Sequence, residues 1–87
     1  MDYVLIDEIR AEYQIPPFFS NDSLNRYVAE GKGVFGRLVP GVDFDEDTTA
    51  RMLLKNYVFY SYNHRTNEFF ENYAELILMW QLGGDVN

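Results

Sequence analysis

Apolar residues recur along much of the chain at the three- and four-residue spacing of amphipathic helices. Near the N-terminus, Ile6, Ile9 and Tyr13 share one helical face, which predicts a first helix over residues 2–13. The prolines that follow end this helix, because the residue before a proline is disfavoured in the α-helical conformation. They open a short linker to the next element.

The longest helical pattern begins after Ser20, Asn21 and Asp22, each of which is a favourable N-cap. Its apolar positions follow the 3.6-residue period: Leu24, Tyr27, Val28, Gly31, Val34, Phe35 and Leu38. Three glycines in this segment each weaken a helix interior by about 1 kcal/mol. Either packing compensates for them, or the helix is bent or loose there. Gly31 lies on the apolar face, where the missing side chain lets another helix approach closely.

An acidic loop leads from this helix into a third. A proline–glycine turn ends the second helix, and the acids at positions 43–47 precede a helix predicted over residues 48–62. Asp45 or Asp47 serves as its N-cap, since acidic side chains suit the first turn. One face of this helix carries Leu53, Leu54, Tyr57, Val58 and Ser61.

The last helix follows a four-residue polar break, residues 63–66. Thr66 or Asn67 is its predicted N-cap, and it ends near Leu82. Its expected buried stripe is Phe70, Tyr73, Ile77 and Trp80, widened by Phe69, Leu76 and Met79. The short connection predicts that the last two helices form an antiparallel hairpin. The fold class is therefore all-α, a small bundle of about four helices in a single domain over residues 1–87.

Aromatic residues are unusually dense. The chain has seven Phe, seven Tyr and one Trp, and eight of these lie between Tyr57 and Trp80. We expect that a hairpin of this size cannot turn all of them into one core, and that some contact another chain, where aromatic residues are enriched. The candidate subunit-interface residues are Phe59, Tyr60, Tyr62, Phe69 and Trp80. The alternative is a small core that uses large side chains to gain buried area.

Charge and composition exclude several classes of site. Acidic residues number 14 and basic ones 7, for a net charge of −7, and no cysteine is present. Disulfides, thiolate zinc sites and thiol nucleophiles are excluded, and a single histidine provides no transition-metal cluster. An acidic chain is poorly suited to gripping DNA phosphates. No stretch is long and apolar enough for a membrane span, and the N-terminus lacks the basic region of a signal peptide.

No motif predicts catalysis or a cofactor. Asp43, Asp45 and Asp47 begin like a calcium loop, but Thr48 and Leu54 stand where glycine and glutamate are needed. The tripeptide Asp22-Ser23-Leu24 matches the attachment site of acyl carrier proteins, and a capped helix start explains the same residues. Around His64, no set of nucleophile, base and orienting group can be assembled. We therefore expect a protein that is not an enzyme.

Three stretches together resemble one known family. Residues 45–63 join an acidic turn to an aliphatic–aromatic helix that ends in Tyr60-Ser61-Tyr62-Asn63. Residues 69–77 contain two phenylalanines, an Asn-Tyr pair and an isoleucine, and residues 5–9 read Leu-Ile-Asp-Glu-Ile. Over about residues 4–82 the chain resembles the head–tail connector (adaptor) family of tailed bacteriophages.

The resemblance implies a structural virion protein of the neck, assembled in the host bacterial cytoplasm. About a dozen identical subunits would form a ring on the portal protein of the DNA-filled head. The ring would extend the DNA channel, which DNA passes without specific binding, and present a platform to the next neck or tail-completion protein. With this family in view, the residues expected to face the lumen or the portal are Asp43, Asp45, Glu46 and Asp47.

Two other functions remain open on the sequence. An acidic binding protein could inhibit a DNA-binding enzyme by mimicking nucleic acid, which requires acids spaced over one face. An acyl-carrier-like protein would carry its prosthetic arm on Ser23.

Overall fold

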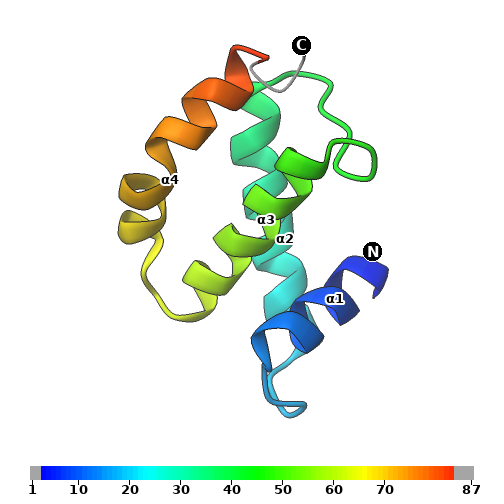
Figure 1. Ribbon diagram of the computed structural model, residues 1–87. Coiled ribbons are helices and arrows are strands. Elements are labelled where there is room, and N and C mark those ends of the chain that lie inside the picture. The colour runs from blue at the N-terminus through cyan, green and yellow to red at the C-terminus, as the bar shows by residue number, and fades with distance from the viewer. Residues whose placement is uncertain (1–2, 84–87) are drawn as a thin grey trace.

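The computed structural model describes residues 3–83, and these form four helices with no strand among them (Figure 1). The helices are α1 (Tyr3–Tyr13), α2 (Asn21–Leu38), α3 (Thr48–Tyr62) and α4 (Thr66–Gln81). The predicted all-α class and number of helices are confirmed. The predicted ranges differ from the observed ones by at most a residue or so at each end.

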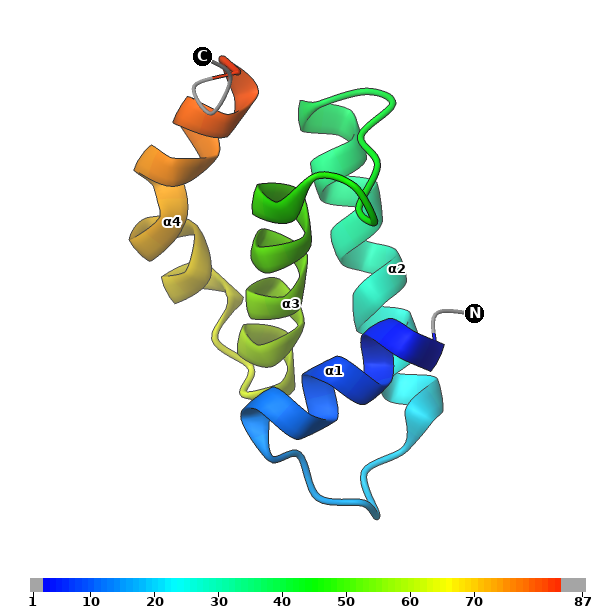
Figure 2. The same cartoon turned by 45° about the vertical axis from the view of Figure 1, so that its right-hand side comes forward.

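Helix α3 lies at the centre of the molecule. Figure 2 shows α4 on one side of α3 and α2 on the other, with α1 crossing the foot of α2 and α3. A connection of three residues reverses the chain between α3 and α4, so these two run antiparallel, as predicted. Because α3 touches all three other helices, its buried residues spread over a broad face.

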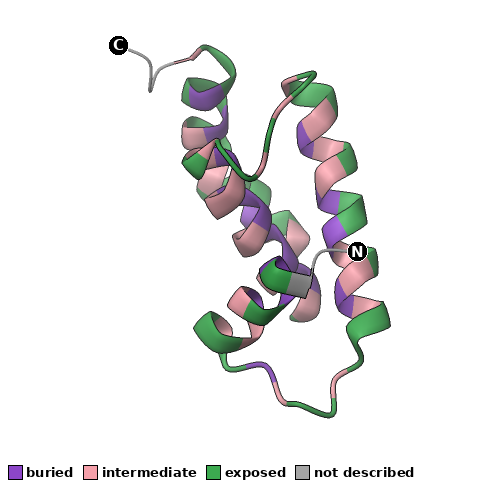
Figure 3. Ribbon diagram, turned by 90° about the vertical axis from the view of Figure 1, so that its right-hand side faces the viewer, coloured by how far each residue is buried: buried purple, intermediate pink, exposed green. Residues whose placement is uncertain are grey.

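The core consists of the helix faces that point toward α3. In Figure 3 the buried segments lie on the inner sides of the helices, and the outer turns are exposed. The fully buried side chains with the largest volumes are Phe35, Phe69, Ile6, Ile9, Leu24, Leu53, Leu54 and Val58. They come from every helix, so no pair of helices encloses the core alone.

Gly31 sets the distance between α2 and α3. A Cβ atom at this position would lie 2.6 Å from Leu54 Cδ1 and 2.9 Å from Tyr57 Cδ2, which is too close for ordinary contact. The predicted role of Gly31 as the point of close helix approach is therefore confirmed. A Cβ atom at Gly33 or Gly36 would meet nothing within 4 Å, so packing inside the chain does not explain these two glycines.

Side-chain caps begin two of the helices. Ser20 Oγ accepts a hydrogen bond from Ser23 N at 3.0 Å at the start of α2. At the start of α3, Asp47 Oδ1 accepts one from Ala50 N at 3.0 Å. Both caps agree with the sequence-based expectation, which left Asp45 as the alternative for α3.

The predicted cap of α4 was wrong. The N-cap is Arg65, not Thr66 or Asn67, and its side chain makes no capping hydrogen bond. The reason lies in the tight reversal before it, where His64 takes a left-handed backbone (φ 58°) and the helical turn starts one residue early. The Arg65 guanidinium instead binds Glu68 in the first turn.

The linker between α1 and α2 is held by Arg10. Its guanidinium donates to Pro16 O at 2.9 Å, to Phe19 O, and to Asn21 Oδ1 at 2.7 Å. These bonds fix the path of the chain around the prolines. The side chain of Phe18, at the far side of this linker, is left 88% exposed.

Candidate functional site

The acidic loop lies at the end of the molecule opposite the α1–α2 linker (Figure 1). Asp43 organises the backbone of this loop. Its Oδ1 accepts hydrogen bonds from Asp45 N at 2.9 Å and from Glu46 N at 3.3 Å. Asp43 O also accepts from Asp47 N at 2.8 Å. The loop therefore has a defined shape that it makes with its own hydrogen bonds.

The Asp47 side chain makes hydrogen bonds within the chain. One carboxylate oxygen caps α3, and the other accepts a hydrogen bond from Trp80 Nε1 at 2.9 Å. The bond to Trp80 ties the loop to the last turns of α4. Because both oxygens are engaged within the chain, the expectation that Asp47 faces a lumen or portal does not fit its position. The side chains of Asp43, Asp45 and Glu46 stay exposed.

Half-buried aromatic rings outside the core pack on other parts of the same chain. Phe59 stacks on Tyr13 of α1 with ring centroids 4.4 Å apart, and Tyr62 meets Phe19 of the linker edge-on at 4.8 Å. Tyr60 contacts Phe69 and Tyr73 of α4. Phe59, Tyr60 and Tyr62, three of the candidate interface residues, are half-buried because α1, the linker and α4 cover part of their surface.

Phe69 and Trp80 are buried, which corrects their assignment to a subunit interface. Both pack edge-on against Phe35 of α2, with ring centroids 6.0 and 5.8 Å away. A side chain enclosed in the core is not accessible to another chain. Of the eight aromatic residues between Tyr57 and Trp80, three are buried (Tyr57, Phe69 and Trp80), four are half-buried and Phe70 is exposed.

The exposed apolar residues are different ones from those the sequence indicated. Phe70 and Met79 are exposed although both were expected on the buried stripe of α4. Leu78 and Leu82 are exposed beside Met79, near the C-terminal end of the helix. The sequence did not predict the exposure of these residues, because apolar residues occur on nearly every side of α4. Periodicity alone therefore does not identify which side of the helix is buried.

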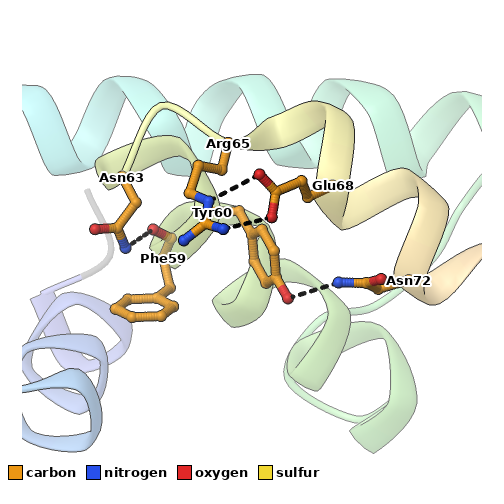
Figure 4. A pocket seen from close by; sticks show the side chains of 6 residues that line it. All are labelled: Phe59, Tyr60, Asn63, Arg65, Glu68 and Asn72. Atoms are coloured by element: carbon orange, nitrogen blue, oxygen red, sulfur yellow. Dashed lines mark hydrogen bonds and ion pairs between the residues drawn. The ribbon is translucent and has the colours of Figure 1, made fainter.

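A shallow pocket of about 300 Å³ lies where α3 turns into α4 (Figure 4). Its lining residues are Phe59, Tyr60, Asn63, Arg65, Glu68 and Asn72. Arg65 Nε and Nη2 donate to the two Glu68 oxygens at 2.9 and 2.7 Å, which lowers the pKa of Glu68. Asn72 Nδ2 donates to Tyr60 Oη at 3.2 Å. The polar groups bind one another, and the pocket holds no nucleophile paired with a base.

Neither a metal site nor a membrane-spanning helix is found in the part of the chain that the structure describes. No three His, Asp or Glu side chains there gather as ion ligands. None of the four helices is both long and apolar enough to cross a bilayer.

Ser23, the residue that an acyl-carrier-like protein would modify, lies in the first turn of α2. Its hydroxyl and its backbone N–H both face Ser20 Oγ, at 3.3 and 3.0 Å. The Asp22-Ser23-Leu24 motif thus lies in the first turn of a helix whose N-cap is Ser20.

The sequence matches no family model, no curated protein and no solved structure.

Proposed function

We propose that this chain is a structural virion protein, a head–tail adaptor that joins the portal of a DNA-filled bacteriophage head to the next neck or tail component. One observation carries the proposal. The stretches that resemble the connector family, 45–63 and 69–77, form an acidic turn, a central helix and a final antiparallel helix in the order that the resemblance implies. The chain's compact all-α form, without a catalytic constellation in the described residues, supports a structural role.

The exposed acids of the loop fit the surface of a DNA channel. Asp43, Asp45 and Glu46 project from one end of the molecule, and a ring of subunits would multiply their charge around an axis. Negative side chains repel DNA phosphates, so DNA passes such a ring without being held. We assign this loop to the lumen or its rim.

Nucleic-acid mimicry has less support from the charge distribution. Four acids, Glu8, Glu12, Asp45 and Glu68, pair with basic side chains at 2.7–3.4 Å, which removes them from a phosphate-like array. The unpaired acids are divided between the loop and the outer sides of helices, with arginines between them on α2. A mimic would instead spread unpaired acids over one face.

The proposal is tested by co-expression with the portal protein encoded in the same phage genome. Size-exclusion chromatography with light scattering is expected to show a portal complex whose mass exceeds that of the portal ring by about a dozen copies of this chain. A portal ring that elutes at its own mass, in the presence of excess folded adaptor, would contradict the proposal.

A matched control separates the loop from the fold. Asp7→Lys and Glu46→Lys each reverse one exposed acid, and neither side chain caps a helix or forms an ion pair in the described residues. Both variants are expected to fold. Only Glu46→Lys is expected to alter DNA passage.

A further inference from the structure

The outward side of α4 carries an exposed apolar patch continued by two acids, which we call the α4 face: Glu71, Glu75, Leu78, Met79 and Leu82. Four of these residues follow one another at intervals of four, three and four, so they line up along the helix, with Met79 at the edge. Leu78, Met79 and Leu82 are 55%, 54% and 77% exposed. Contiguous exposed apolar side chains beside charged ones are typical of a contact surface.

The acids of the α4 face have no basic neighbour on their own helix. Glu71 and Glu75 lie in the two turns before the apolar patch, and neither forms an ion pair with a described residue. Between Thr66 and Leu82 the sequence contains no lysine or arginine. The nearest base in the sequence, Arg65, is bound to Glu68 at 2.7 Å. The negative charge of the α4 face is therefore left for a partner to neutralise.

A second copy of this chain does not offer a matching basic surface. Arg51 and Lys55 pair with acids of α1. On the outward side of α2, Arg26 lies between two exposed acids, one four residues before it and one four residues after it, so this side is balanced in charge. Arg37 is exposed as a single cation. The positive charge that complements the α4 face therefore comes from a different molecule.

We propose that the α4 face binds an amphipathic helix of another protein, one that carries apolar side chains next to lysines or arginines. A helix suits the surface, because the α4 face is a straight stripe of about 16 Å along the side of one helix, and the ridges of one helix pack between those of another. The partner's apolar side chains would cover Leu78 and Leu82, and its cations would lie opposite Glu71 and Glu75.

The acids of the α4 face also disfavour other partners. Glu71 and Glu75 would repel the phosphates of nucleic acid and the headgroups of an anionic lipid surface. Two α4 faces docked on each other would bring four carboxylates together. Of these surfaces, a cationic and apolar protein helix alone is attracted by both parts of the α4 face.

The α4 face can be tested without the ring or the portal, because its exposure and charge belong to the single chain. This inference goes beyond the proposed function for the same reason, and the two can fail separately.

The experiment uses two synthetic amphipathic helices of about 18 residues, each ~27 Å long. One is built from leucine and lysine, and the other has glutamate in place of every lysine. Isothermal titration calorimetry measures their binding to the full chain, and shifts of backbone amide signals in NMR spectra locate it. The leucine–lysine helix is expected to bind and to shift the signals of residues 71–82. The leucine–glutamate helix is expected not to bind.

Two double variants separate the apolar part of the α4 face from the charged part. Leu78→Ser with Leu82→Ser is expected to weaken binding of the leucine–lysine helix by about tenfold or more. Glu71→Lys with Glu75→Lys is expected to weaken it as well and to create binding of the leucine–glutamate helix. All four positions are exposed, so the fold is expected to persist, which circular dichroism verifies.

A matched control distinguishes the α4 face from the charge of the whole chain. Asp7→Lys with Glu46→Lys changes the net charge by the same amount at exposed acids outside the α4 face. This variant is expected to bind the leucine–lysine helix as the wild type does. A loss equal to that of the Glu71→Lys, Glu75→Lys variant would show that binding follows net charge alone and would overturn the inference.

Other results would overturn it too. They are a leucine–lysine helix that does not bind at up to about 1 mM, signal shifts confined to other parts of the chain, and binding that persists when both leucines are replaced. Binding of the wild type to lipid vesicles, or self-association of the wild type, that is lost in the leucine variant would assign the α4 face to a membrane or to a second copy instead.

Discussion

At the scale of single residues, the glycines of α2 have different roles although they lie within six positions of one another. Gly31 faces Leu54 and Tyr57 at distances that leave no room for a methyl group. Gly33 and Gly36 face open space. Helix propensity is similar for all three, so their neighbours determine what a substitution does.

Gly31→Ala is therefore expected to destabilise the chain by about 1–3 kcal/mol, because the buried side chains of α3 have to move. Gly33→Ala adds the same methyl group without a clash and is expected to stabilise by about 0.5–1 kcal/mol. Urea denaturation followed by circular dichroism measures both. Equal effects of the two substitutions would show that helix approach at Gly31 is not constrained.

Asp47 links three parts of the molecule through one carboxylate. Asp47→Ala removes the cap of α3, worth about 0.5–2 kcal/mol, and leaves the indole N–H of Trp80 without its partner, which costs about 1–3 kcal/mol. We expect a loss near the sum of these, measured by thermal unfolding. Glu46→Ala, at the neighbouring exposed position, is the control and is expected to change stability by less than about 0.5 kcal/mol. Similar small losses for both would contradict the structural role of Asp47.

At the scale of elements, ion pairs join α1 to α3. Arg51 Nη2 lies 2.8 Å from Glu8 Oε2, and Lys55 Nζ lies 3.4 Å from Glu8 Oε1 and 2.7 Å from Glu12 Oε2. The hydrogen bond from Arg51 is the largest cause that lowers the pKa of Glu8 below its ordinary 4.5, and Lys55 lowers it further. These ion pairs, together with the apolar contacts of the buried Ile6 and Ile9, hold α1 against the rest of the fold.

The lowered pKa of Glu8 predicts a pH dependence. A carboxyl group with a depressed pKa stabilises the fold above its ordinary value of 4.5, and that stabilisation is lost as the pH falls through the lowered value. Glu8→Gln is thus expected to be destabilising at pH 7 and to approach the wild type at pH 3. Glu71→Gln, at an acid without a basic partner, is expected to show no such pH-dependent difference. A Glu8→Gln effect that is the same at both pH values would contradict the ion-pair account.

The elements also show which features the sequence could predict. The 3.6-residue period and the caps at Ser20 and Asp47 were sufficient to locate the helices, because these depend on neighbours within a few positions. The buried face of α4 depends instead on Phe35, which is far away in the sequence and packs on Phe69 and Trp80. No local pattern carries that information.

The cover over some of the candidate interface residues was missed for the same reason. Phe59 and Tyr62 lie on the side of α3 away from its apolar face, and the rings that cover them, Tyr13 and Phe19, come from α1 and the linker. The exposure of Asp45 and Glu46 was easier to predict, because charged side chains in a short loop stay largely in solvent. Asp45 remains 87% exposed although it pairs with Arg51.

At the scale of the whole molecule, the exposed acids and the exposed helix faces occupy different places. The acidic loop is at one end of the molecule, while the outward sides of the helices run along its length (Figure 1). In a ring built by contacts between the sides, each loop would occupy an equivalent position at one end. Lateral association and contact with DNA would thus use separate residues.

This separation predicts that the loop's charge can be changed without loss of the ring. Asp45→Lys combined with Glu46→Lys is expected to leave assembly on the portal intact and to retard DNA ejection, because lysines attract the phosphates that the acids repel. Ejection from purified virions, followed by the release of DNA over time at two salt concentrations, measures the effect, which higher salt should reduce. Ejection at the wild-type rate would contradict the assignment of the loop to the DNA channel.

The most direct measurement is cryo-electron microscopy of the complex formed with the portal protein of the same phage. The account predicts a closed ring of this chain on the portal, with the exposed loop acids Asp43, Asp45 and Glu46 directed toward the channel or the portal. A portal ring that carries no density for this chain, in a sample where both proteins are present and folded, would contradict it.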